Sequence, residues 1–280
     1  MLPFPHAHWY VGAFMLLTVA AFLPSYFAVL PTAPWVHHLH GITASAWILL
    51  LMTQNWSAHR RRWRLHVWSG KASLVLLPFF TVGGLLVTQH TLLRDSNFKT
   101  LFGEALSIAD LIVSAAFIHF YAMALRHRRS PDRHARYMLA TVILLAGPSL
   151  SRIFANYVPG FLVRSLETLP NFGAALDASF VLVCAFCLLL VIRDYRANQP
   201  IAPFSAALAA NAAMIGGYYG IGYTETYARF ADWFAIQPVG GIVLCGAAAS
   251  VLASVWGWNA GKLKNASPAN TEGSTAQQTA

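Results

Sequence analysis

Repeated apolar runs of about 20 residues constrain this chain more than any other feature. A helix of that length crosses a hydrocarbon core about 30 Å thick with all of its backbone groups hydrogen-bonded internally. The chain is 57% hydrophobic and only 10% charged, whereas soluble domains carry about 25% charged residues. The sequence therefore predicts an all-α integral membrane protein, a polytopic bundle of transmembrane helices.

Eight runs are expected to cross the membrane. No linker rich in Gly, Pro or Ser separates them, so we expect one transmembrane helical domain over residues 1–258. The polar, low-complexity residues 259–280 are expected to form a disordered cytoplasmic tail. The predicted spans are residues 9–30, 35–56, 67–89, 103–125, 136–156, 173–192, 203–223 and 236–257.

Most of the 19 lysines and arginines lie at alternate connections between these spans. Cytoplasmic loops of membrane proteins carry such an excess of positive charge. We therefore expect both termini in the cytoplasm and the protein in the cell inner membrane. The net charge of +9 is interpreted as a topology signal with contacts to the lipid bilayer, and no nucleic-acid partner is expected. The basic positions are Arg60, Arg61, Arg62, Arg64, Lys71, Arg126, Arg128, Arg129, Arg133, Arg136, Arg193, Arg196, Lys262 and Lys264.

Histidines lie near the ends of the second and third predicted spans. His37 and His40 are one helical turn apart at the start of the second span, and His66 and His90 lie near the two ends of the third. Ionisable side chains inside a bilayer are costly, so each is a candidate functional residue. The alternative is that these histidines are hydrogen-bonded structural or interfacial residues.

The fourth and fifth spans carry further ionisable residues. Asp110 and His119 lie on the fourth span about half a turn out of phase, which predicts different neighbours for them. His134 and Arg152 lie at opposite ends of one face of the fifth span, and Pro148 predicts a kink just before Arg152. The candidate acceptors for an Arg152 guanidinium inside the membrane are Asp110 and Asp177.

Three helix starts share a pattern: "HLHG", "LHVWSG" and "RHARYM", the last followed by "GPSLSR". Over residues 35–155 the chain resembles a bacterial family of predicted integral membrane proteins of unknown function. It departs from the family pattern at Val67, where Arg is usual, and has Tyr137 at a commonly aromatic position. The resemblance implies a membrane protein and no particular activity. The matching positions are His40 with Gly41, His66 with Gly70, His134 with Met138, and Arg152.

The first functional hypothesis is a b-type haem protein that transfers electrons in the membrane. Bis-imidazole haem needs two histidines at one depth on facing helices, and arginines can pair with its propionates. Such a protein would also need a membrane electron-transfer partner. The candidate haem-binding residues are His40, His66, His119, His134 and Arg152.

Two other functions stay open. Imidazole and carboxylate suit zinc or non-haem iron, so a metal-dependent membrane enzyme is one alternative; its candidate ligands are His37, His40, His90, Asp110 and Asp177. The other is a small-molecule or proton-coupled transporter or binding protein with an outward-facing cavity. Charges inside the membrane and the Tyr-rich segment "GGYYGIGYTETY" would line that cavity.

Overall fold

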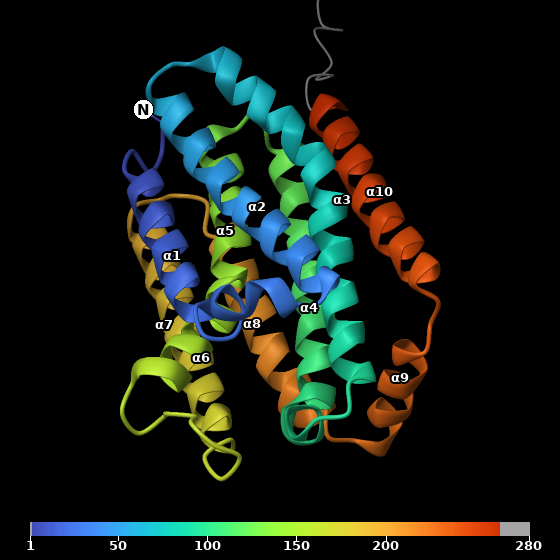
Figure 1. Ribbon diagram of the computed structural model, residues 1–280. Coiled ribbons are helices and arrows are strands. Elements are labelled where there is room, and N and C mark those ends of the chain that lie inside the picture. The colour runs from blue at the N-terminus through green and yellow to red at the C-terminus, as the bar shows by residue number, and fades with distance from the viewer. Residues whose placement is uncertain (1, 264–280) are drawn as a thin grey trace, which may run out of the picture.

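A computed structural model describes residues 2–263, and the regular structure in that range is helical throughout (Figure 1). This confirms the all-α prediction. A short 3₁₀ helix covers Phe27–Thr32 and a π-helical turn covers Lys99–Gly103. The α-helices are α1 (Ala7–Phe22), α2 (Trp35–His59), α3 (Trp63–Leu93), α4 (Glu104–Arg126), α5 (Pro131–Leu144), α6 (Ala146–Tyr157), α7 (Asn171–Arg196), α8 (Ala202–Gly220), α9 (Glu225–Ala235) and α10 (Val239–Leu263).

Several of these helices are long and apolar enough to cross a membrane, which is consistent with the predicted membrane protein. In the described part of the chain, five segments are long and apolar enough to cross a bilayer: Trp63–Leu93, Lys99–Arg126, Pro131–Tyr157, Asn171–Arg196 and Val239–Lys262. The first predicted span differs from the structure, because α1 ends at Phe22 and not near residue 30. Pro24 and Pro31 explain the difference, since proline cannot continue an α-helical hydrogen-bond ladder.

The fifth predicted span is interrupted between α5 and α6. α5 ends at Leu144 and α6 begins at Ala146. Pro148 lies four residues after Leu144. Because proline has no N–H, it cannot donate to the Leu144 carbonyl, and its ring clashes with that carbonyl. Pro148 therefore causes the break, as the sequence predicted, and the break changes the direction of the segment that carries Arg152.

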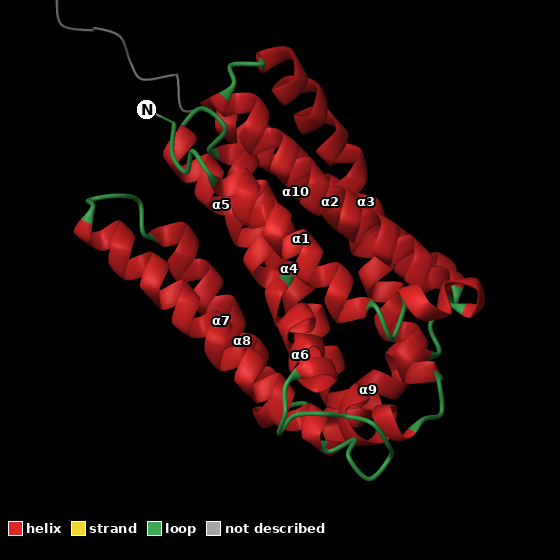
Figure 2. Cartoon of the chain, turned by 60° about the vertical axis from the view of Figure 1, so that its left-hand side comes forward, coloured by secondary structure: helices red, strands yellow, loops and turns green. Residues whose placement is uncertain are grey.

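Both described ends of the chain lie at the same end of the bundle (Figure 1). The connections from α2 to α3, α4 to α5 and α7 to α8 lie there too, and they carry the arginine clusters; we call this the basic end. α10 packs against α3 and α4, while α7 packs against α6 and α8. Figure 2 shows α7 and α8 side by side along one flank.

Aromatic side chains fill the middle of the bundle. Trp47 is fully buried, and its ring lies 4.9 Å from Phe117, 5.5 Å from Tyr121 and 6.2 Å from Phe80. The Trp47 indole N–H donates to the Thr141 hydroxyl at 3.0 Å, which satisfies its polar atom. This aromatic layer separates two groups of polar residues, one towards the basic end and one towards the opposite end.

Two segments differ from the predicted spans near the carboxyl end. α9 is an 11-residue helix in a stretch that was expected to connect spans, and α10 continues to Leu263, into the first residues of the predicted tail. The rest of the predicted disordered tail, residues 264–280, lies outside the described residues.

Candidate functional site

The close approach of α2 and α3 places His40 inside the bundle. A Cβ atom on Gly83 would lie 3.1 Å from the His40 Cα, so the missing side chain is what lets the two backbones meet there. The His40 ring stacks on Phe80 at a centroid distance of 5.3 Å. His40 therefore lies directly on the aromatic layer, on the side away from the basic end.

Further polar side chains surround His40 on α2, α3, α4 and α6. The ring of His37 lies edge-on to that of His90, with centroids 5.4 Å apart. The Thr88 hydroxyl donates to Asp110 Oδ2 at 3.1 Å, which joins α3 to α4. We call these residues, with Arg152, the polar cluster: His37, His40, Thr88, His90, Asp110 and Arg152.

Arg152 and Asp110 carry opposite charges in this cluster without touching. Each lies within electrostatic reach of the other, and both residues are half-buried. Arg152 takes part in none of the four ion pairs formed within 4 Å by described residues. Its Nη1 donates to the Pro148 carbonyl of its own helix at 3.0 Å, and its guanidinium lies 4.5 Å from the Phe22 ring centroid. The predicted direct partnership with Asp110 or Asp177 is therefore not formed.

Two nitrogen atoms in the polar cluster are buried and have no hydrogen-bond partner among residues 2–263. They are His40 Nδ1 and His90 Nε2. A buried polar atom without a partner costs about 1–3 kcal/mol, and such atoms are few in folded proteins. The cluster thus brings free imidazole nitrogens, a guanidinium with unused N–H groups and a carboxylate close together.

The connection after α1 covers the end of this region. The Tyr26 hydroxyl and His38 Nδ1 share a hydrogen bond of 2.9 Å. Burial raises the pKa of Tyr26, so the hydroxyl stays protonated at neutral pH. Tyr26 also packs against Gly41, where a Cβ would lie 3.3 Å from the tyrosine ring. Gly41 therefore makes room for the cover over the polar cluster.

The second group of polar residues lies between the aromatic layer and the basic end. His66 donates its Nδ1–H to the Gln54 carbonyl at 3.2 Å, and His134 donates its Nδ1–H to the Ala124 carbonyl at 2.9 Å. The two rings lie within electrostatic reach of each other. In each neutral ring the proton therefore lies on Nδ1 and Nε2 is unprotonated. A histidine in this tautomer can ligate a metal or haem iron through Nε2. We call His66 and His134 the histidine pair.

Two candidates from the sequence stand apart from both groups. His119 is exposed on the surface of α4, so it faces away from the other proposed haem ligands. Asp177 accepts a short hydrogen bond from Tyr219 on α8 and is not part of the polar cluster. The Tyr-rich segment does border a surface hollow, lined in part by Gly222, Tyr223 and Thr224. Within residues 2–263, no three His, Cys, Asp or Glu side chains are grouped closely enough to hold a metal ion.

A buried ion pair at the basic end was not expected from the sequence. Asp194 on α7 is 1% exposed and accepts from Arg136 Nε at 2.6 Å and from Arg193 Nη2 at 2.7 Å. Both guanidinium groups lie within 5.0 Å of the Phe4 ring centroid. This arrangement ties α5, α7 and the start of the chain together. Its only sequence signal was an acid between two arginines at the end of an apolar run, which is also the pattern of a solvated helix end.

Comparisons with family models, curated proteins and solved structures found no match for this chain. The resemblance based on the three helix starts stays a prediction.

Proposed function

We propose that the chain crosses a bacterial inner membrane eight times, with both termini in the cytoplasm. Besides the five long apolar segments, α1, α2 and α8 run through the same bundle (Figure 1). The arginine-rich connections all lie at the basic end, which supports a cytoplasmic position for that end. The polar cluster then lies in the outer half of the membrane domain.

We propose further that the polar cluster binds a small polar solute, as in a binding protein or a proton-coupled transporter. One observation carries this proposal: two buried imidazole nitrogens lack partners beside an arginine and an aspartate that do not pair. A solute with acceptors for Arg152 and a group that bonds to the free imidazole nitrogens would satisfy all of these atoms. Ionisable groups inside a membrane mark solute and proton paths in general.

Thermal unfolding of the purified protein tests this proposal. A panel of small carboxylates, amino acids and neutral polar solutes is added to the wild type, because a solute that binds the folded state raises the unfolding temperature. At a concentration 100 times its dissociation constant, the solute stabilises the fold by about 2.7 kcal/mol. This gain is expected to disappear in Arg152→Gln and to persist in His6→Gln, which changes an exposed imidazole outside the cluster.

Two outcomes count against a solute site in the polar cluster. The first is a solute that stabilises wild type and Arg152→Gln equally, because it binds elsewhere. The second is a panel in which no solute raises the unfolding temperature of the wild type.

A second candidate function, electron transfer through b-type haem, is favoured by the histidine pair. Both rings are held by carbonyl acceptors on Nδ1, and both histidines lie in the first turn of a helix, α3 or α5, that begins at the basic end. Haem ligated there would lie near the cytoplasmic arginines, which can pair with propionates. A membrane electron-transfer partner would complete this function.

Absorbance of the detergent-purified protein tests the haem candidate. A Soret band that shifts on dithionite is expected in the wild type. His66→Ala and His134→Ala should each remove it, while His119→Ala should keep it because His119 faces outward from α4. A colourless wild-type protein from cells supplied with haem would reject this function and leave the solute site untouched.

A further inference from the structure

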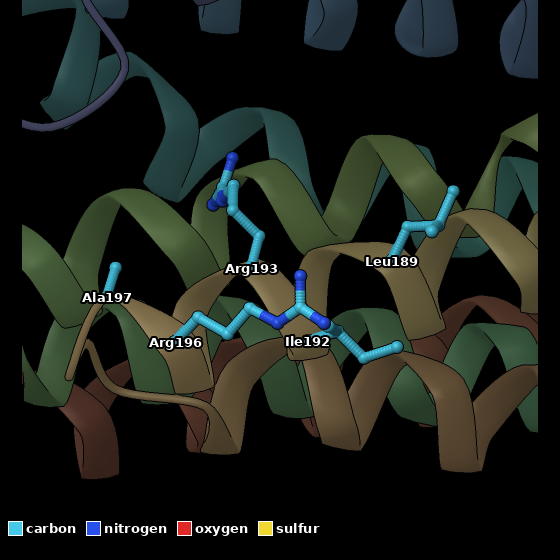
Figure 3. Close-up of a pocket in the computed structure, with 5 residues that line it drawn as sticks. All are labelled: Leu189, Ile192, Arg193, Arg196 and Ala197. Carbon is cyan, nitrogen blue, oxygen red and sulfur yellow. The ribbon is translucent and has the colours of Figure 1, made fainter.

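A shallow hollow lies on α7 at the basic end, separate from both groups of polar residues. It is lined by Leu189, Ile192, Arg193, Arg196 and Ala197 (Figure 3). Leu189 is 64% exposed and Ile192 is 38% exposed, so the described chain leaves part of the apolar side of the hollow uncovered. α7 is among the segments long and apolar enough to cross a membrane, and in the proposed topology acyl chains reach this surface.

The lining residues change from apolar to cationic along the helix. Positions 189, 192, 193 and 196 follow at steps of three, one and three, which puts them on one face of α7. The leucine and isoleucine lie towards the membrane interior and the two arginines at the helix end. Figure 3 shows the Arg196 side chain extended along the helix to beside Ile192. A phospholipid has the same order of chemistry, with acyl chains below a charged headgroup.

The two arginines of the hollow differ in their existing partners. Arg193 directs Nε and Nη2 to Asp194 Oδ1 at 3.1 and 2.7 Å, which leaves its Nη1 unused. Arg196 makes no hydrogen bond or ion pair with any residue between 2 and 263. Asp194 is 1% exposed and already paired with two arginines, so its carboxylate is not available to Arg196. The hollow therefore presents an uncompensated guanidinium next to bare apolar surface.

We propose that this hollow binds one anionic phospholipid. Its phosphate bonds to Arg196, with Arg193 Nη1 as a second donor, and an acyl chain lies along Leu189 and Ile192. Guanidinium groups form charge-assisted hydrogen bonds with phosphate oxygens, and a basic residue near an anionic membrane surface attracts such lipids. The geometry assigns Arg196 as the main contact because it has no competing partner.

Native mass spectrometry of the detergent-purified full chain tests the proposal. The protein is titrated with phosphatidylglycerol and, separately, with phosphatidylcholine, and the apparent dissociation constant of the first bound lipid is measured. The wild type is expected to prefer phosphatidylglycerol. Arg196→Gln should weaken phosphatidylglycerol binding about fivefold, the effect of one basic residue at a membrane surface, while Arg196→Lys should keep most of the preference.

The matched control is Arg229→Gln, which removes another exposed arginine, 77% exposed on α9. This variant should bind phosphatidylglycerol as the wild type does. The proposal is overturned if the wild type binds both lipids equally, if Arg196→Gln binds phosphatidylglycerol unchanged, or if Arg229→Gln loses as much affinity as Arg196→Gln. The unfolding temperature of Arg196→Gln should equal that of the wild type, which separates lost binding from lost fold.

Discussion

The bundle contains ionisable side chains of two kinds, those that form ion pairs and those that do not. Asp194 is enclosed between Arg136 and Arg193, and the Arg136 side chain is itself only 4% exposed. In the polar cluster, by contrast, Arg152 and Asp110 lie near each other without forming an ion pair, and His40 Nδ1 has no partner. The first arrangement satisfies its charges within the fold, while the second leaves groups that the proposed solute would bind.

Asp194→Ala should destabilise the protein strongly. Removing one partner of a buried pair leaves the other as an uncompensated buried charge, here Arg136, at a cost of about 3–5 kcal/mol. Chemical unfolding in detergent measures the change. The control, Glu225→Gln, breaks an exposed pair with Arg229 and should cost less than about 1 kcal/mol. Equal losses in the two variants would contradict the structural role of Asp194.

His40→Phe should have the opposite effect on stability. The phenyl ring keeps the stacking on Phe80 and removes the unpartnered Nδ1 atom, so a gain of about 1 kcal/mol is expected. The same variant should lose the solute-dependent rise in unfolding temperature, because functional sites trade stability for binding. A loss of stability in the solute-free protein would show that His40 Nδ1 is already satisfied.

Most residues of the polar cluster were predictable from the sequence as candidates, but they were divided between two hypotheses. Arg152 was a candidate haem residue and His37, His90 and Asp110 were candidate metal ligands, whereas the structure brings all four together with His40. Periodicity places a residue on one face of its own helix and gives no information about the helix that faces it. The ion pair between Asp194 and Arg136, which lie 58 positions apart, could not be predicted for the same reason.

Helix contacts set the geometry of the polar cluster at the scale of elements. α2 and α3 meet where Gly83 faces the His40 backbone, and Gly84 faces its ring, where a Cβ would lie 3.6 Å from Cε1. Small residues let membrane helices approach closely and gain packing contacts. The position of His40 therefore depends on a glycine in the neighbouring helix.

Gly83→Ala should separate α2 from α3. The added Cβ would lie 3.1 Å from the His40 Cα, and backbone cannot move aside as a side chain can, so a loss of about 1–3 kcal/mol is expected. Thermal unfolding with and without a binding solute measures both the fold and the site. Gly216→Ala on α8 is the control: its Cβ meets no atom within 4 Å, so unchanged or slightly higher stability is expected.

Long apolar elements were predictable, and short ones were not. The break before α6 followed from Pro148, because proline acts through local geometry. α9 was missed, although Thr224 accepts from the Tyr227 N–H as an N-cap and Tyr227, Ala231 and Ala235 form a buried stripe at steps of four. An 11-residue amphipathic helix gives a weak signal when it lies between two membrane-length runs.

Charge is distributed asymmetrically over the whole molecule. The arginine-rich connections gather at the basic end, whereas Glu104 and Glu225 line the hollow at the opposite end. Positive charge resists translocation, so the basic end is expected to stay in the cytoplasm. α1 is the weakest part of this topology: its 16 residues span about 24 Å as a helix, less than a hydrocarbon core of about 30 Å.

Reporter fusions decide between eight crossings and seven. Alkaline phosphatase, which is active only outside the cytoplasm, is fused after residues 95, 129, 165, 197, 223 and 263, while a cysteine near residue 6 is labelled from outside. Eight crossings predict phosphatase activity after residues 95, 165 and 223, inactivity after residues 129, 197 and 263, and no labelling of the N-terminal cysteine.

If α1 lies along the membrane surface without crossing, the fusions keep this pattern and the N-terminal cysteine becomes accessible. Activity after residue 129 or 263 would instead place the basic end outside, and the polar cluster would then open towards the cytoplasm.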